Sequence, residues 1–372
     1  TLLAAAYVAL MIWTYRRVVG LFDGEPLRRR AALPWTFGLL LLAGCDFLAI
    51  RGGTGASVAN VSKVYFSSNM FLNHAATNPV FSFLTTLGDH TDYASEYPFF
   101  DETTRTAKFD ALRGNGPASG PSERVLTKTR PNVVVVILES FARTIMDADV
   151  DGRPVMPNMR RLRDEGIWFE NFFANSFRTD RGEVAVLSGF PAQTRMSIMK
   201  LPAKSRSLPS LARSLAREGY ATSFVYGGDL NFTNQASYMY ATGWQQLVWQ
   251  RDLRFDTPPS DWGYDDAVMC DWFADCVIAQ SGTGEPFLAG LLTLSSHRPF
   301  DVPFSRFDDR ELNAFAFADD CVGRMIDNTR SRMVRNAGRP FLIWGYATVV
   351  TTLAVWAAYA LFPGRNWYYL WL

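Results

Sequence analysis

The chain has 372 residues, of which 48% are hydrophobic and 20% charged, an ordinary globular mixture with room for two or three domains of about 150 residues. Its 37 basic and 36 acidic residues give a net charge of +1, which excludes a nucleic-acid binder that works through a general positive field. With only three histidines (His74, His90 and His297) and four cysteines, zinc-ribbon and histidine-rich metal chemistry are excluded as well.

The first part of the chain, residues 1–50, predicts transmembrane helices. Residues 1–13 form an uncharged apolar run too short to cross about 30 Å of hydrocarbon, so we expect the remnant of a longer helix there. Residues 31–50 have the length of a span. The short arginine-rich loop between the two runs is typical of the cytoplasmic side, so the chain after Ile50 is expected outside the cytoplasm.

The last part, residues 329–372, is an arginine-rich stretch followed by a third apolar run at residues 341–362. The arginines lie on the side that the first helices assign to the outside, which contradicts the positive-inside pattern. Two interpretations remain open: either this run does not insert in that direction, or the tail is not native to the body of the protein.

Between these ends, residues 51–130 are interpreted as an extracytoplasmic connector and residues 131–328 as a soluble α/β domain. The β-branched run from Asn132 to Leu138 is typical of a strand buried on both faces of a parallel sheet. A helix feeding a strand, the α/β repeat, recurs downstream. The pattern therefore predicts a doubly wound sheet that is incomplete in its C-terminal part; its further expected elements are a helix at 208–218, strands at 221–226 and 287–294, and a helix at 310–327.

Polar residues at the strand ends are the candidate site, because ligands of open parallel sheets bind outside the carboxyl ends of the strands. Glu139 follows the first strand and suits a hard metal or a general base, or else caps the next turn. Thr179 stands where a loop enters a helix, which favours a nucleophilic oxygen. The alternative there is a capping box, with Asp180 as the cap and Glu183 as its partner.

The third group is His297 with Arg298, directly after the strand expected at 287–294. A histidine and an arginine at a strand end suit a phosphate or sulfate group. A purely structural histidine is the competing interpretation.

Five ordered motifs carry a resemblance to a known family: NVVVVILESF, SFRTDRGEVAVLSGFPAQ, FVYGGDLNF, FLAGLLTLSSHRPFDVP and NAFAFADDCVGRMID. Over roughly Val58 to Asp327 the chain resembles the lipoteichoic acid synthases, sulfatase-like phosphoglycerol transferases of the alkaline phosphatase superfamily. The resemblance implies a multi-pass protein of the bacterial inner membrane with its catalytic domain outside the cytoplasm. It also implies a divalent metal, manganese or else magnesium.

By motif position, the resemblance implies that Thr179 is both nucleophile and metal ligand, that Glu139 is a second metal ligand, and that His297, with Arg298 beside it, binds the substrate phosphate. The implied reaction moves a phosphoglycerol group from phosphatidylglycerol, a membrane phospholipid donor, to a cell-envelope glycan or polymer. No nucleic acid is expected as a partner.

Two departures from the family pattern keep other interpretations open. Tyr226, Thr233 and Gln235 stand where the family carries His, Trp and Arg, and the family's Asp-His-Gly metal motif is missing from this sequence. A carboxylate and a hydroxyl alone are too few ligands for tight divalent binding. The alternatives are an inactive or truncated relative that binds lipid or glycan, and a sulfuric or phosphoric ester hydrolase. The formylglycine sulfatase motif C/S-x-P-x-R is absent.

Overall fold

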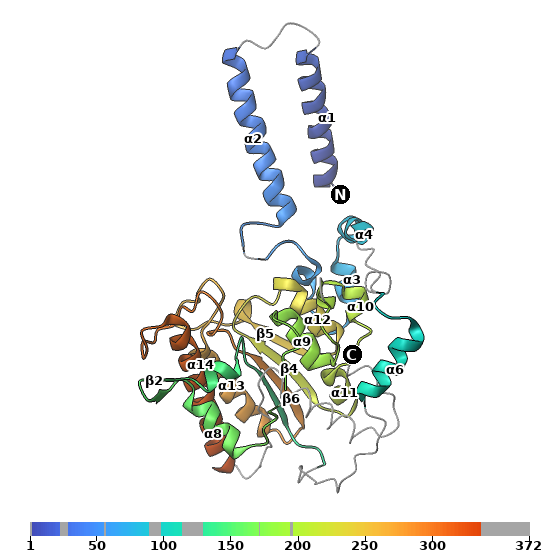
Figure 1. Ribbon diagram of the computed structural model, residues 1–372. Coiled ribbons are helices and arrows are strands. Elements are labelled where there is room, and N and C mark those ends of the chain that lie inside the picture. Colours follow the sequence, from blue (N-terminus) through green and yellow to red (C-terminus); the bar gives the residue numbers. More distant parts are fainter. Residues whose placement is uncertain are drawn as a thin grey trace. The chain divides into compact units, whose positions relative to one another are not determined.

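The computed structural model describes residues 2–22, 29–55, 57–88, 98–113, 129–170, 172–193 and 196–335 (Figure 1). The chain divides into two units, residues 1–59 and 60–372. The third apolar run expected at residues 341–362 lies outside the described residues.

The first unit consists of helices α1 (Leu2–Phe22) and α2 (Arg29–Arg51). Within α2, the stretch Leu33–Arg51 has a mean hydropathy of 1.8 and is long and apolar enough to cross a membrane. None of this stretch is buried by other parts of the chain. The one acidic residue of that stretch, Asp46, accepts a hydrogen bond from the Tyr7 hydroxyl of α1 at 3.3 Å. By length and composition α2 is therefore a candidate membrane anchor.

The second unit is built on a parallel sheet of the order β1-β6-β4-β5. Strand β1 (Val133–Ile137) pairs with β6 (Phe287–Leu292), β6 with β4 (Ala221–Tyr226), and β4 with β5 (Gln246–Trp249). The three strands expected from the sequence are all present. Strand β5 was not expected.

Helices cover both faces of the sheet. Alternate side chains of β1 point to opposite faces: Val134 and Val136 join one hydrophobic cluster, and Val135 and Ile137 join the other. The first cluster is completed by α8 (Pro157–Glu165), α13 (Asp266–Ser281) and α14 (Arg310–Arg335). The second is completed by α9 (Thr179–Ser188), α11 (Leu211–Arg217) and α12 (Gln235–Ala241). This arrangement confirms the doubly wound α/β fold.

Part of the predicted connector belongs to this body. Tyr65 is only 3% exposed and packs in the second cluster. The Asn60 side chain donates to the Asn231 carbonyl at 2.8 Å, and the Ser237 amide donates to the Ser62 hydroxyl at 3.0 Å. The chain is thus fastened to the body directly after the first unit; its elements in this region are η1 (Val61–Val64), α3 (Met70–Ala76), α4 (Pro79–Gly88) and α6 (Glu102–Arg113).

Short elements complete the described chain: α7 (Arg143–Met146), the β2 (Asp149–Val150) and β3 (Arg153–Pro154) hairpin, η2 (Ile198–Lys200), α10 (Pro202–Ser205), η3 (Phe232–Asn234) and η4 (Gln250–Asp252).

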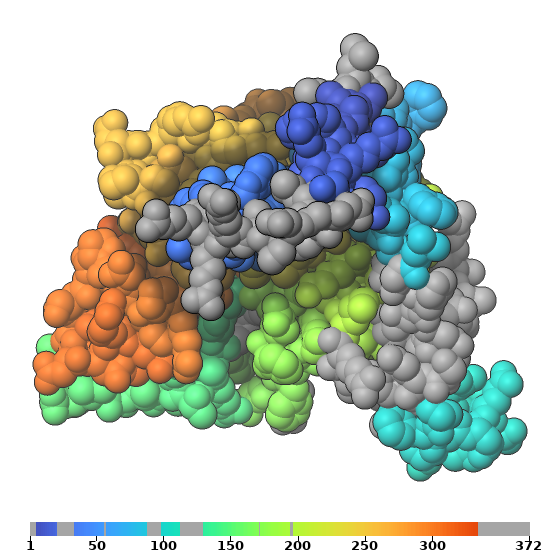
Figure 2. Space-filling view, turned by 90° about the horizontal axis from the view of Figure 1, so that it is seen from above, coloured from blue at the N-terminus to red at the C-terminus, as the bar shows by residue number. Residues whose placement is uncertain are grey.

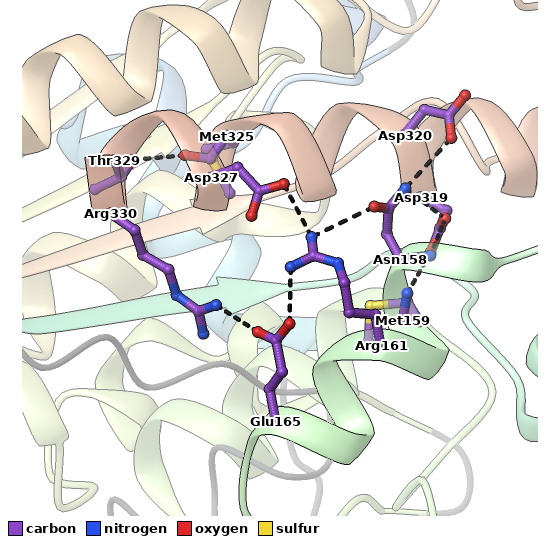
Figure 3. A network of polar contacts seen from close by, with 10 residues as sticks. All are labelled: Asn158, Met159, Arg161, Glu165, Asp319, Asp320, Met325, Asp327, Thr329 and Arg330. Carbon is purple, nitrogen blue, oxygen red and sulfur yellow. Dashed lines mark hydrogen bonds and ion pairs between the residues drawn. The ribbon is translucent and has the colours of Figure 1, made fainter. Parts of the chain in front are cut away.

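Helices α8 and α14 are joined by a polar network (Figure 3). Asp319 of α14 is fully buried and accepts hydrogen bonds from the backbone amides of Asn158 at 2.9 Å and Met159 at 2.8 Å. These amides belong to the first turn of α8, whose own N-cap residue makes no side-chain cap. Burial raises the pKa of the Asp319 carboxyl to about 6. Asp319 therefore caps α8 from another helix.

Further along the same pair of helices, Arg161 of α8 binds Asp327 of α14 at 3.0 Å, and Arg330 of α14 binds Glu165 of α8 at 2.5 Å. Figure 2 shows the orange part of the chain, near residue 300, directly beside the green part, near residue 150. The two helices are thus held together along their length.

Candidate functional site

Glu139 lies just beyond the carboxyl end of β1, where the neighbouring strand β6 fixes its backbone. The Glu139 amide donates to the Thr293 hydroxyl at 2.8 Å, and the Ser296 hydroxyl donates to the Glu139 carbonyl at 2.6 Å. Both partners follow β6, whose last residue is in register with the last residue of β1. The edge of the sheet therefore holds Glu139 in a defined position.

Thr179, the first residue of α9, meets this glutamate. Its hydroxyl donates to Glu139 Oε2 at 2.8 Å, and the Ser140 hydroxyl donates to Oε1 at 2.7 Å. Ser140 has a φ of 57°, a left-handed conformation that few residues other than glycine adopt. The structure thus brings the two predicted metal ligands into direct contact, with a hydroxyl on each oxygen of the carboxylate.

The alternative capping interpretations do not describe these residues. The N-cap of α9 is Arg178, which makes no side-chain cap, and Asp180 is the second helical residue. The capping box with Asp180 as the cap is therefore wrong. Asp180 is instead buried and pairs with Arg178 at 3.3 Å. The Glu139 side chain does not cap the next turn through a backbone amide either, because its two oxygens accept hydrogen bonds from the hydroxyl groups of Thr179 and Ser140.

Glu183 is a buried acid beside this pair. Its side chain is fully buried, and neither carboxyl oxygen has a hydrogen-bond partner within the described part of the chain. Burial first, and then the charges of Asp180 and Glu139, raise the pKa of Glu183 well above its ordinary value; Gln235 offsets only part of this effect. Burial and the neighbouring acids therefore disfavour ionisation of the Glu183 carboxyl.

Tyr226, at the end of β4, is neutral for the same reasons. Its pKa is raised by burial and then by the nearby charge of Glu139. The acidic groups around the strand ends thus disfavour any further negative charge on the protein itself.

His297 and Arg298 follow Ser296, the residue that binds the Glu139 carbonyl. The His297 ring is half-buried, and its Nδ1 lies 2.7 Å from the Arg298 carbonyl oxygen. The Arg298 side chain is exposed, and its guanidinium lies 5.9 Å from the centre of the Phe300 ring. The structure therefore brings His297 to the same sheet edge as Glu139, whereas Arg298 extends along Phe300.

Asp266, which the sequence did not single out, shapes this histidine turn. Its two carboxyl oxygens accept the amides of Leu294 at 2.8 Å and Ser295 at 3.0 Å. In return, the Ser295 hydroxyl accepts the Asp266 amide at 2.8 Å. Burial raises the pKa of Asp266 to about 6. The beginning of α13 is thereby clamped to the turn that carries His297.

The donors for a divalent metal are limited. Glu139 and Thr179 supply two oxygen ligands, whereas magnesium and calcium take at least six. Among residues 2–335 as far as they are described, no three His, Cys, Asp or Glu side chains are grouped to hold a metal ion. The described residues therefore do not fit a complete metal site.

Comparison with known proteins defines the class. The sulfatase family model matches residues 131–336, more than half of the chain. The chain therefore belongs to the sulfatase family, and its parallel α/β sheet is that of the alkaline phosphatase superfamily.

Similar curated proteins include phosphoglycerol transferases and lipoteichoic acid synthases. Phosphoglycerol transferase I of Xanthomonas campestris pv. campestris is 28% identical over 237 residues, covering 56% of this chain and 32% of the relative. Lipoteichoic acid synthase 1 of Bacillus subtilis is 23% identical over 184 residues, covering 46% of this chain and 27% of the relative. The chain thus spans about a third of the length of these relatives.

Two solved structures share the fold. The lipoteichoic acid synthase LtaP from Listeria monocytogenes has a TM-score of 0.57 at 19% identity, covering 64% of this chain and 60% of that one. An alkaline phosphatase superfamily protein from Vibrio parahaemolyticus has a TM-score of 0.57 at 22% identity, covering 68% and 64%. Together with the family match, these structures confirm the resemblance to sulfatase-like, lipoteichoic acid synthase-like proteins.

Proposed function

We propose that this chain is a membrane-anchored phosphoglycerol transferase that moves the phosphoglycerol group of phosphatidylglycerol to a cell-envelope glycan or polymer. The observation that carries the proposal is the 2.8 Å hydrogen bond from Thr179 Oγ1 to Glu139 Oε2 at the carboxyl edge of the sheet. The relatives named phosphoglycerol transferase I support the reaction type.

In the proposed reaction, Thr179 is the nucleophile and Glu139 accepts its proton. The threonine oxygen bonds to phosphorus as the bond from phosphorus to the diacylglycerol oxygen breaks, and Glu139 passes its proton to that oxygen, which leaves as diacylglycerol. An acceptor hydroxyl then gives its proton to Glu139 and bonds to phosphorus, and Thr179 leaves with the proton that Glu139 returns to it. The group bound to threonine between the two steps is phosphoglycerol.

His297 is proposed to bind the phosphoryl group and Arg298 to approach it from the exposed side. The Nδ1 of His297 faces the Arg298 carbonyl, so Nε2 is the nitrogen left for a ligand.

We infer that the chain is anchored in the bacterial inner membrane, passes it more than once, and holds its catalytic domain outside the cytoplasm. Helix α2 supports anchorage, and the arginine-rich loop before it supports the orientation. This location places the reaction at the leaflet where a phospholipid donor would be met.

The family resemblance implies a divalent cation such as manganese. We assign it no step in the reaction, because Glu139 and Thr179 alone are too few ligands for its coordination shell. Elemental analysis of the purified full chain tests this directly. Stoichiometric manganese or magnesium after dialysis would require ligands other than those described.

The experiment for the proposed function measures release of fluorescent diacylglycerol from labelled phosphatidylglycerol by the full chain in vesicles. We expect Thr179→Ala to abolish release and Thr179→Ser, which keeps a hydroxyl, to retain part of it. Thr257→Ala, at an exposed threonine, is the matched control and should behave as the wild type.

Unchanged release by Thr179→Ala would overturn the role of Thr179. Absence of release by the wild-type chain would overturn transfer in favour of an inactive lipid- or glycan-binding relative. Free glycerol phosphate as the sole product, with an acceptor present, would instead indicate an ester hydrolase.

A further inference from the structure

Three aromatic side chains from separate loops meet at the carboxyl end of the sheet. The Trp262 and His297 rings have centroids 4.4 Å apart with a tilt of 52°, and the Phe232 ring meets Trp262 edge-on at 5.7 Å and 84°. Phe232 follows β4, Trp262 precedes α13 and His297 follows β6. A tryptophan is therefore in ring contact with the proposed phosphate-binding histidine.

A tight turn fixes the tryptophan. The Ser260 amide donates to the Gly263 carbonyl at 2.8 Å, and the Gly263 amide donates back to the Ser260 carbonyl at 3.2 Å. The Ser260 hydroxyl adds a bond to the same Gly263 carbonyl at 2.9 Å. Asp261 and Trp262 thus form the tip of a closed two-residue loop, which fixes the backbone position from which the indole projects.

The turn is also fastened to the end of β4. The Tyr264 amide donates to the Gly227 carbonyl at 3.0 Å, and Gly263 forms a bridge with Gly228. Gly263 has a φ of +139°, and a Cβ there would lie 2.2 Å from the Gly227 oxygen. Only glycine allows this approach, so Gly263 lets the loop that carries Trp262 dock closely on the end of β4.

The histidine itself has one nitrogen committed. Because the Arg298 carbonyl oxygen can only accept, Nδ1 of His297 carries the proton of that hydrogen bond, and Nε2 is left for a ligand. This single hydrogen bond still leaves the imidazole ring free to change its tilt. Contact with the indole ring of Trp262 restricts that freedom, and the Phe232 ring in turn packs edge-on against the indole.

We propose that Trp262 is a positioning residue: its indole holds the His297 imidazole so that Nε2 is presented to the phosphoryl group of the lipid donor. This inference rests on the proposed function. It goes beyond it by assigning the orientation of the histidine to a loop outside the strand-end motifs. Phe232 supports this arrangement by packing against the indole ring of Trp262.

The first test needs no activity. In the full chain labelled with ¹³C-histidine and carrying no histidine tag, only three ring signals exist, since the sequence has three histidines. His297→Gln identifies the signal of interest. We expect Trp262→Leu to move that signal by loss of the indole ring current, and Trp272→Phe, at a half-buried tryptophan of α13, to leave it in place.

The second test measures kcat and KM for phosphatidylglycerol. Trp262→Leu should raise KM about three- to tenfold with a smaller change in kcat, and Trp262→Phe, which keeps a ring against the imidazole, should recover most of the loss. If Trp262→Leu does not fold, Trp262→Phe is compared with Phe232→Leu, which removes only the ring that supports the indole and should give an intermediate KM.

An unmoved His297 signal in Trp262→Leu would overturn the contact, and a moved signal with unchanged KM would overturn its role in binding the donor. A failure of the proposed function is distinguishable, because it shows as unchanged turnover in Thr179→Ala, whereas the NMR comparison still reports on the indole and imidazole.

Discussion

The carboxylate of Glu139 accepts two hydroxyl hydrogen bonds, from Ser140 and Thr179, while its backbone is held by Thr293 and Ser296. Four contacts from three chain segments leave it little freedom to rotate. For the proton-accepting role proposed for Glu139, this arrangement holds the carboxylate against the threonine hydroxyl in the geometry that general-base activation requires.

The buried Glu183 makes stability depend on pH. Between its ordinary pKa of 4.5 and the higher pKa of the folded state, the folded chain keeps a proton that the unfolded chain has lost, so stability falls as pH rises. We expect Glu183→Gln to flatten this fall and to raise the stability of the protein at pH 8 above that of the wild type, because the variant has no carboxyl to ionise.

The measurement is the midpoint of thermal unfolding, followed by tryptophan fluorescence from pH 4.5 to pH 8. Glu285→Gln, at an exposed glutamate, is the control and should leave the pH dependence as it is. A variant Glu183→Gln with the slope of the wild type would show that Glu183 is ionised in the folded protein.

Sequence reasoning found Glu139, Thr179 and His297 because each stands at a recognisable boundary, after a strand or at the start of a helix. It did not find Trp262, because ring contact with His297 depends on a turn docked onto β4. Glu183 was seen only as a capping partner, since its burial follows from the packing of α9 on the sheet and not from its neighbours in sequence.

At the scale of elements, α8 depends on α14 for its N-terminal cap. The turn before α8 supplies no capping side chain, so the amides of Asn158 and Met159 rely on Asp319 (Figure 3). Such trans capping couples two helices that lie far apart in sequence but pack on the same face of the sheet.

We expect Asp319→Ala to destabilise the protein by about 1–3 kcal/mol, because one buried and one partly buried amide lose their acceptor. The loss should lower the thermal midpoint by several degrees. Asp319→Asn keeps one acceptor oxygen and should lose less.

The adjacent Asp320 offers a matched control. Its pair with Arg306 at 2.6 Å is partly exposed, so Asp320→Ala should cost less than about 1 kcal/mol. Equal losses for Asp319→Ala and Asp320→Ala would contradict the capping role.

The bounds of the helices and strands show where the sequence pattern is enough to predict an element and where it is not. The strand at 221–226 was predicted with its observed bounds, because the helical pattern before it ends at Gly219. Helix α14 extends to Arg335, beyond the expected end at Asp327, because Thr329 and Met333 continue its buried stripe through the arginine-rich stretch. Strand β5 was missed, since its four residues carry too little pattern to separate from a loop.

At the scale of the whole molecule, the apolar helix α2 predicts behaviour of an integral membrane protein. We expect the full chain to stay in the membrane pellet after alkaline carbonate extraction. Leu41→Arg, near the middle of the apolar stretch, should shift part of the protein to the supernatant, since a central arginine costs about 2.5–3.5 kcal/mol on insertion.

Val58→Arg lies outside that stretch and should leave the protein in the pellet. Equal extraction of the wild type and Leu41→Arg would contradict membrane insertion of α2.

The strand order has a consequence for how this protein reaches its folded state. Strand β1 has only β6 as its neighbour within the described sheet, and Glu139 and Thr293, which bond beyond their ends, are 154 residues apart in sequence. A chain made from its N-terminus must therefore hold the apolar segment Val133–Leu138 unpaired until residue 292 has emerged. Such long-range pairing slows folding and exposes a strand edge to aggregation. The glutamate and the threonine of the site can meet only late in biogenesis, so a chain interrupted before β6 carries both residues without the sheet edge that unites them.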